Sequence, residues 1–325
     1  SITILLSNAQ SYKTSFPQIP RIDPHMHMYE KSKMQFERYL SFRDSVKTVL
    51  DADVVLWINM SANNPDSARV YTNGRMLCAM RSTESDIDFS TKEQFDSLKN
   101  AGYVGYKIWY GPFSRREKSK HPYIDDPAHN EAFSTIEKEG VQLLSLHIAD
   151  PNGPFEWRTK WAPDPVEYWR QIIGFERVLS RHPDMKVIAA HGAWLMTQDA
   201  QLDFLRYMLD TYPNFNVDIS ATMEYSNLQS YDNLRDFYID YQDRLIWASD
   251  MSDISSEQTF NIRMELYENW FHFLETTDSF GKDISSNGKD LKGLGLPADV
   301  LKKLYYKNAL RLYPKEVEDT FNSLR

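Results

Sequence analysis

Short apolar runs recur along the whole chain, separated by longer segments of mixed character. Each run is a few residues long and rich in Val, Ile, Leu and aromatic side chains. This length and composition favour strands, because helices usually need about ten residues or more. The eight runs are Pro20–His27, Val54–Asn59, Arg75–Met80, Val104–Trp109, Val141–His147, Lys186–His191, Phe215–Ser220 and Arg244–Asp250.

Helix signals stand between several of these runs. Ser90-Thr91-Lys92-Glu93 has the pattern of a capping box ahead of an apolar-periodic segment. Asp164-Pro165 supplies an N-cap and a first-turn proline for a helix over Glu167–Arg181, and a similar segment covers Thr197–Tyr212. Because parallel strands need crossovers of about a dozen residues, usually helical, the alternation predicts parallel pairing.

The predicted fold class is therefore α/β, and eight strands are the number that a (β/α)8 TIM barrel requires. An open, doubly wound sheet is the alternative, but its first strand is normally followed by a glycine-rich phosphate loop. This chain has Asp23-Pro24-His25-Met26-His27 at that place. Since no Gly/Ser-rich linker or repeat divides the 325 residues, we expect one barrel domain over residues 20–325 after an extension over 1–19.

The composition of the chain limits the classes of molecule that this protein can bind. Hydrophobic residues make up 42% of the chain, enough for a large core, and no apolar stretch is long enough to insert into a membrane. A net charge of -9 argues against nucleic-acid binding, which normally needs a basic face. The single cysteine, Cys78, excludes an intrachain disulfide and is predicted to be buried in its run. We expect a small-molecule substrate, and a homo-oligomer is compatible with these features.

The first residues carry a separate signal. Ile2–Leu6 followed by Ser7-Asn8-Ala9 resembles the end of a secretory apolar region and a small-x-small cleavage site. This interpretation predicts export to the periplasm or the exterior. The alternative is an ordinary N-terminal strand that closes the bottom of the barrel in a cytoplasmic protein.

Potential metal ligands stand at or near the C-terminal ends of five of the predicted strands. Strand side chains alternate between faces, so His25 and His27 point the same way. An acid that ends an apolar strand, as Asp250 does, needs a partner, and a metal or a histidine is the natural one. The candidates are His25, His27, Lys107, His147, His191 and Asp250.

Imidazoles with one carboxylate suit zinc, and also manganese or iron, and leave a position open for water. The alternative is that these are separate, hydrogen-bonded core or rim residues. The remaining histidines lie in polar loops or helices and are predicted to be at the surface. They are His121, His129, His182 and His272.

Five segments, in order, resemble the amidohydrolase superfamily, most closely its amidohydrolase-related branch of metal-dependent hydrolases and nonoxidative decarboxylases. Arg21–His27 is similar to the first-strand Asp-x-His-x-His signature, and Gly105–Ile108 to the fourth-strand Gly-x-Lys segment. The other matching segments are Pro183–Gly192, Ile246–Asp250 and Lys307–Leu312, which resemble the sixth strand, the eighth strand and the closing Asn-Ala helix.

The resemblance implies a role for each matching residue. His25, His27 and His147 are implied metal ligands, His191 a ligand or oxyanion stabiliser, and Asp250 a ligand and proton shuttle. Lys107 is implied as a ligand only if it is carboxylated and bridges two metals. Otherwise it pairs, unmodified, with a carboxylate or the substrate.

Three functions follow as hypotheses. The first is hydrolysis of an ester, lactone or amide of a small acidic or cyclic substrate, because a divalent metal makes hydroxide available at neutral pH. The second is nonoxidative decarboxylation of an aromatic or unsaturated acid at the same centre, with Asp250 protonating carbon. The third is a noncatalytic ligand-binding barrel, against which the intact ligand set argues.

Loops after the fourth and fifth runs add cations and aromatic residues at the end of the barrel where substrates bind. The cations suit an acidic group and the tryptophans a ring or sugar face. Solvated surface charge is the alternative. The candidate substrate contacts are Trp109, Tyr110, Arg115, Arg116, Trp157 and Arg158, together with Glu224 shortly after the seventh run.

Overall fold

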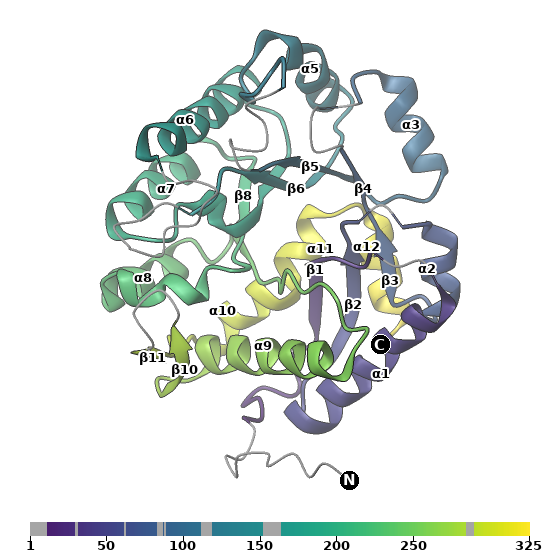
Figure 1. Ribbon diagram of the computed structural model, residues 1–325, viewed down its shortest axis with the longest axis vertical. Coiled ribbons are helices and arrows are strands. Elements are labelled where there is room, and N and C mark those ends of the chain that lie inside the picture. Colours follow the sequence, from purple (N-terminus) through teal and green to yellow (C-terminus); the bar gives the residue numbers. More distant parts are fainter. Residues whose placement is uncertain are drawn as a thin grey trace.

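The computed structural model describes residues 12–29, 32–61, 63–82, 87, 89–111, 119–151, 164–283 and 289–325. Parallel strands form a central ring in these residues (Figure 1). The strands of the ring are β1 (Arg21–Met26), β2 (Val54–Asn59), β3 (Met76–Cys78), β4 (Met80–Arg81), β5 (Tyr106–Tyr110), β6 (Leu143–Ile148), β7 (Val187–Ala189), β8 (Phe215–Asp218) and β9 (Leu245–Ile246).

Backbone hydrogen bonds close the ring. The predicted run Arg75–Met80 is split into β3, which pairs with β2, and β4, which pairs with β5. After β9, the N–H of Asp250 donates to the carbonyl of His25 at 2.8 Å, and the N–H of His27 donates to the carbonyl of Met251 at 2.7 Å. The predicted (β/α)8 barrel is thereby confirmed.

The last strand is shorter than predicted. The predicted strand covers Arg244–Asp250, whereas β9 covers only Leu245–Ile246. The N–H of Trp247 donates at 3.0 Å to the carbonyl of Leu304, in the π-helical turn η5 (Lys303–Lys307), in place of a neighbouring strand. A contact with a distant helical segment therefore ends the ladder early.

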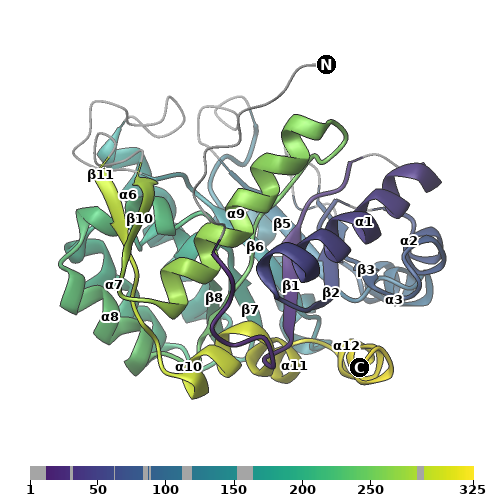
Figure 2. The ribbon, with the colours of Figure 1, turned by 90° about the horizontal axis from the view of Figure 1, so that it is seen from below.

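In the part of the chain that the structure describes, α-helices surround the strands (Figure 1). They are α1 (Lys33–Leu50), α2 (Pro65–Tyr71), α3 (Lys92–Asn100), α5 (Asn130–Lys138), α6 (Pro165–Arg181), α7 (Asp199–Thr211), α8 (Tyr231–Asp240) and α9 (Glu257–Glu275). Figure 2 shows α10 (Ala298–Lys302), α11 (Asn308–Leu312) and α12 (Lys315–Ser323) at one end of the barrel. The other elements of the described residues are the short helices η1 (Pro127–His129), η2 (Ala190–Trp194) and η3 (Met223–Leu228) and the antiparallel hairpin of β10 (Ser279–Asp283) and β11 (Lys289–Lys292).

The predicted helix starts are close to those observed. Asp164 caps α6, since its side chain accepts a hydrogen bond from the N–H of Val166. The capping box of α3 forms one residue later than expected, between Thr91 and Gln94. Helix α7 begins at Asp199, two residues after the predicted Thr197. Helix start signals of this kind are therefore accurate to about two residues here.

The core contains Cys78, as predicted, and burial raises the pKa of its thiol to about 12. The surface prediction for two histidines is wrong, because His129 and His182 are buried. His129 Nε2 lies 2.9 Å from the hydroxyl of Tyr110, and His182 Nδ1 lies 3.0 Å from Glu137 Oε2. These polar partners, which come from other elements, make burial possible.

The described part of the N-terminal extension, residues 12–19, leads past α9 into β1 (Figure 2). Residues 1–11, with the proposed cleavage site, lie outside the described residues. Within the residues that the structure describes, none of the helices is both long and apolar enough to cross a bilayer.

Candidate metal centre

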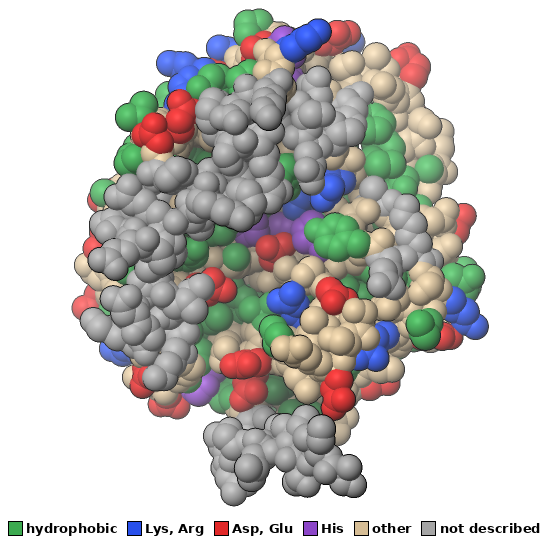
Figure 3. Space-filling model, in the orientation of Figure 1, with side chains coloured by type: hydrophobic (Ala, Val, Ile, Leu, Met, Phe, Trp, Pro, Cys, Tyr) green, Lys and Arg blue, Asp and Glu red, His purple; other side chains and the backbone are tan. Residues whose placement is uncertain are grey.

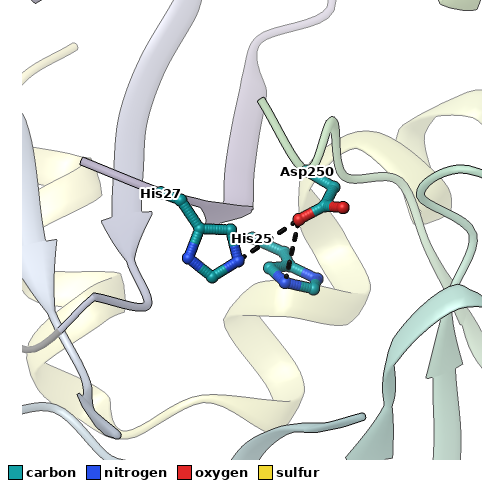
Figure 4. Close-up of side chains that lie close together, drawn as sticks. All are labelled: His25, His27 and Asp250. Carbon is teal, nitrogen blue, oxygen red and sulfur yellow. Dashed lines mark ion pairs between the residues drawn. The ribbon is translucent and has the colours of Figure 1, made fainter. Parts of the chain in front are cut away.

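Three predicted ligands converge at the C-terminal ends of β1 and β9. The Nε2 atoms of His25 and His27 lie 3.4 Å and 3.2 Å from Asp250 Oδ1, and Figure 4 shows both rings beside this carboxylate. One ligand atom of each residue lies within 4.8 Å of the others. The two histidines are buried, whereas the Asp250 side chain is 31% exposed and can meet a bound molecule.

A second pair of histidines stands on the other side of Asp250. His147, from β6, and His191, after β7, approach each other to 3.2 Å between Nδ1 and Nε2. His191 Nε2 is 4.0 Å from Asp250 Oδ2. The fold thus brings all five predicted histidine and aspartate candidates to one place, although they come from four strands.

Lys107 belongs to the same cluster. Its side chain is buried, and Nζ lies 2.7 Å from His25 Nε2. Burial lowers the pKa of Lys107 to about 8, although the nearby Asp250 and Asp218 favour its charged form. Because a lysine reacts with carbon dioxide as the neutral amine, this environment is compatible with both states considered for Lys107.

The outward nitrogens of three histidines are held by hydrogen-bonding partners. His25 Nδ1 lies 3.0 Å from Asp218 Oδ2, and His27 Nδ1 lies 2.9 Å from the hydroxyl of Ser61. His191 Nδ1 lies 3.0 Å from the carbonyl oxygen of Ser220. A partner on Nδ1 orients the ring and leaves Nε2 for a metal.

Asp218 is a site residue that the sequence analysis did not single out. The signal was present, because Asp218 is an acid within the apolar run Phe215–Ser220, as Asp250 is in its own run. Burial alone would raise the pKa of Asp218, but the adjacent His25 and His191 lower it to about 2. Asp218 is therefore a charged, buried carboxylate that holds His25.

We predict that Asp218→Asn weakens metal binding about 10- to 100-fold, the usual effect of losing a ligand's orienting partner. The zinc dissociation constant, measured by competition with a chromophoric chelator, checks this. Asp210→Asn is a matched control, because Asp210 lies at the surface in the last turn of α7 and contacts Tyr241. Unchanged affinity in Asp218→Asn would mean that His25 does not need this carboxylate to bind metal.

Burial also favours the neutral form of three of the imidazoles, those of His27, His147 and His191. It lowers the pKa of His27 to about 3 and lowers the pKa of both His147 and His191. Neutral imidazole is the form that binds metals. Burial would raise the pKa of Asp250, but His25, His27 and His191 outweigh it and hold that pKa well below its usual value.

Strained backbone accompanies the strand ends. His191, Ala193 and Trp194 have φ values of 58°, 53° and 56°, in the left-handed region that non-glycine residues rarely adopt. At Gly192, between them, a Cβ atom would meet the side chain of Met196 at 2.5 Å. Asp250 is also left-handed, with φ 52°. Such strain concentrates at functional sites, where surrounding contacts enforce it.

Asp23, in the first-strand motif, makes hydrogen bonds that hold the backbone next to Asp250. Its carboxylate accepts hydrogen bonds from the N–H of Ser249 at 3.0 Å and from the Ser249 hydroxyl at 2.6 Å. Tyr267 donates a further hydrogen bond from its hydroxyl. Burial raises the pKa of Asp23 to about 6. The first strand therefore holds the segment that carries Asp250 as well as two of the candidate ligands.

The cluster opens into a cavity of about 290 Å³, and Figure 3 shows histidine side chains deep in the centre of this face. The lining residues are His27, Tyr29, Arg81, Lys107, Trp109, His147, His191, Asp250 and Ser252. A larger cavity, about 770 Å³, lies at the other end of the strands, near Tyr106 and Arg311, and none of the candidate ligands lines it. The chemistry of the lining, rather than cavity size, therefore locates the candidate site.

The predicted substrate contacts divide into three groups. Trp109 lines the cavity, with its ring centre 5.8 Å from that of His147. Tyr110, the next residue along β5, is buried on the opposite face against His129, and Glu224 lies in η3 outside the cavity lining. The others lie outside the described residues, namely Arg115, Arg116, Trp157 and Arg158.

Comparison with known proteins agrees with this architecture. Residues 22–315 match the family model described as Amidohydrolase, and the chain belongs to the amidohydrolase family. A search of curated proteins finds no match.

Several solved structures match this chain in fold, among them the following two. An uncharacterized TIM-barrel protein, Bb4693 from Bordetella bronchiseptica, is 15% identical with a TM-score of 0.57, over 93% of this chain and 99% of that one. ATU3138 from Agrobacterium tumefaciens, an apo structure, is 10% identical with a TM-score of 0.50, over 93% and 97%. At this level of identity the likeness shows the barrel fold alone.

Proposed function

We propose that this protein is a metal-dependent hydrolase that cleaves an ester, lactone or amide bond in a small acidic or cyclic substrate. The observation that carries the proposal is the convergence of His25, His27 and Asp250 on one point at the barrel mouth. Family membership supports it, since the superfamily comprises metal-dependent hydrolases and related decarboxylases.

The donor set fits a divalent cation. Two imidazole nitrogens and a charged carboxylate oxygen lie together, and Asp218 and Ser61 hold the far sides of the two rings. His147 and His191 offer further nitrogen donors on the other side of Asp250. Nitrogen with oxygen donors suits zinc first, and manganese or iron as well. A bound divalent cation would act as a Lewis acid and lower the pKa of water.

The residues around the ligands have roles of their own. Asp250 is ionised and partly exposed, so it can take a proton from the attacking water and return it to the leaving group. His191 faces the same cavity, and its Nδ1 donates to the carbonyl of Ser220, so Nε2 of the neutral ring can bind a metal. In the protonated ring, Nε2–H would instead stabilise negative charge on the carbonyl oxygen of the substrate. Trp109 offers an apolar wall against which the substrate can pack.

A decarboxylase is the second candidate. The observation that favours it is the pair of cations, Arg81 and Lys107, in the cavity lining, because both can hold a carboxylate. The same Asp250 would then protonate carbon in place of a leaving group. Products separate the two reactions, since decarboxylation releases carbon dioxide and hydrolysis releases an acid with an alcohol or amine.

The noncatalytic barrel is the third candidate, and all the predicted ligands are present in this chain, which counts against it.

The test of the proposal is metal content by elemental mass spectrometry on protein purified without chelator. We expect about one zinc, manganese or iron per chain and almost complete loss in His25→Ala, because His25 is buried at the centre of the cluster. Ester or lactone cleavage should disappear with a chelator and return with added metal. About two metals per chain would instead indicate a carboxylated Lys107. No metal after reconstitution would contradict the proposal and favour the noncatalytic barrel.

His121→Ala provides the matched control for that experiment. His121 lies outside the cluster, where Nδ1 is 3.0 Å from Asp126 Oδ1. Metal content should equal that of the wild type. A loss in His121→Ala as large as that in His25→Ala would mean that the metal binds adventitiously to surface histidines.

A further inference from the structure

We propose that Arg81 determines the specificity of this pocket by binding a carboxylate group of the substrate, with Trp109 and Tyr29 on either side of the substrate's carbon skeleton. The proposal deepens the proposed function and rests on it for the location of the reaction. It names a substrate class, namely small carboxylic acids that also carry the bond to be cleaved.

The strand register brings Arg81 into the pocket. Arg81, in β4, is paired with Lys107, in β5, in a parallel ladder. Residues paired in this way project from the same face of a sheet. Lys107 and Trp109, two residues apart, both line the cavity with Arg81. Three neighbouring side chains on two strands therefore form one wall of the cavity, next to His25 and His147.

The charge of this lining favours an anion. Among the described residues that line the cavity, Arg81 and Lys107 are cationic and Asp250 alone is a carboxylate. The chain as a whole has a net charge of -9, so this described lining differs in sign from the chain overall. A bound divalent metal would add further positive charge. Figure 3 shows basic side chains next to the histidines in the hollow of this face. Such a pocket raises the local concentration of anionic ligands.

The two cations are placed differently. Lys107 is buried, and its Nζ lies 2.7 Å from His25 Nε2. Its amino group is therefore at the bottom of the cavity. Arg81 is half-buried and therefore lies nearer the opening. A guanidinium presents five N–H donors in a rigid fork that matches a carboxylate, a match that lysine cannot reproduce. Arg81 is therefore the better receptor for an acidic group that enters from solvent.

Tyr29 supports this placement from the rim. Its ring stacks on His27, with centroids 5.7 Å apart and planes within 4°, although the side chain is 59% exposed. Burial raises the pKa of the Tyr29 hydroxyl overall, although Arg81 and Ser61 lie close enough to lower that pKa. The stacking on His27 holds an exposed aromatic ring over a candidate ligand and near the Arg81 guanidinium. Trp109, on β5, adds a further apolar surface to the cavity lining.

Binding of two matched probes tests the role of Arg81 without requiring turnover. The probes are 4-phenylbutyrate and its neutral analogue 4-phenylbutyramide, titrated calorimetrically into zinc-loaded full-length protein. We expect the wild type to bind the acid about 10- to 100-fold more tightly than the amide, because a charge-assisted hydrogen bond to arginine has that strength. Arg81→Met should lose this preference, and Arg81→Lys should keep part of it.

The controls separate a local effect from a general one. Arg69→Met removes a cation on α2 that pairs with Glu316, and it should bind both probes as the wild type does. Zinc content in Arg81→Met should equal that of the wild type. If Arg81→Met is insoluble, Arg81→Gln, which keeps a polar side chain in the wall, serves in its place. Equal binding of the two probes by the wild type, or a preference that survives in Arg81→Met, would overturn the proposal.

Hydrolysis of two esters distinguishes this proposal from the proposed function. Mono(4-nitrophenyl) succinate and 4-nitrophenyl butyrate release the same chromophore and differ in one carboxylate. A binding preference that depends on Arg81, with neither ester cleaved, would support the acid site and count against the hydrolase. Cleavage of both esters with equal kcat/KM, unaltered by Arg81→Met, would support the hydrolase and remove Arg81 from recognition.

Discussion

Asp250→Asn is expected to abolish turnover while the fold is retained. The substitution removes the group that accepts and returns a proton, and loss of a general acid–base typically lowers kcat about 10²- to 10⁴-fold. Asparagine has nearly the volume of aspartate. It also tolerates the left-handed backbone that Asp250 adopts at φ 52°, and the hydrogen bond from the Asp250 N–H to His25 does not involve the side chain. The defect should therefore lie in kcat rather than in stability.

Steady-state kinetics, circular dichroism and metal content together check the Asp250 prediction. Asp253→Asn is the matched control, because Asp253 is an exposed carboxylate three residues away that accepts from the N–H of Ser255. It should retain wild-type kinetics. Full activity in Asp250→Asn would remove Asp250 from the mechanism, whereas loss of the metal together with activity would assign it chiefly to metal binding.

Glu275→Ala is expected to produce the largest loss of stability. Glu275 is a buried carboxylate at the end of α9, and Arg21 Nη2 donates to its Oε1 at 2.9 Å. Tyr305 donates to Oε1 at 2.8 Å and Thr14 donates to Oε2 at 2.6 Å. The Arg21 guanidinium carbon lies 4.5 Å from the centres of the Phe271 and Tyr305 rings. Removal of Glu275 therefore leaves a fully buried guanidinium without its counter-ion.

We expect Glu275→Ala to lower the free energy of unfolding by about 3–5 kcal/mol, the usual result of breaking a buried ion pair from one side. Urea unfolding monitored by tryptophan fluorescence measures it. Glu265→Ala, on an exposed position of the same helix, should change that free energy by less than about 0.5 kcal/mol. The double variant Arg21→Met with Glu275→Met should recover much of the loss, because no unpaired charge remains. A Glu275→Ala protein as stable as the wild type would refute this account.

Local sequence patterns predicted most of the architecture. The composition and length of a run such as Val54–Asn59 predicted a strand, and this run coincides with β2. In the same way, Asp164 with Pro165 indicated the start of α6. These signals depend on residues near one another in sequence. The predictions that failed, namely the surface positions of His129 and His182 and the extent of the last strand, depended on partners from distant elements.

For the candidate site, the sequence by itself determined which residue types stand at the strand ends, because strand alternation and strand length decide where His25, His27, His147, His191 and Asp250 emerge. Only the tertiary structure decided which of them meet. The register between strands brings Lys107 Nζ to His25 and Arg81 beside Lys107, and barrel closure brings Asp250 next to β1. The same closure makes Asp218 the partner of His25 across 193 residues of chain. Distances between side chains on different strands depend on register and ring closure, and no local pattern in the chain encodes either.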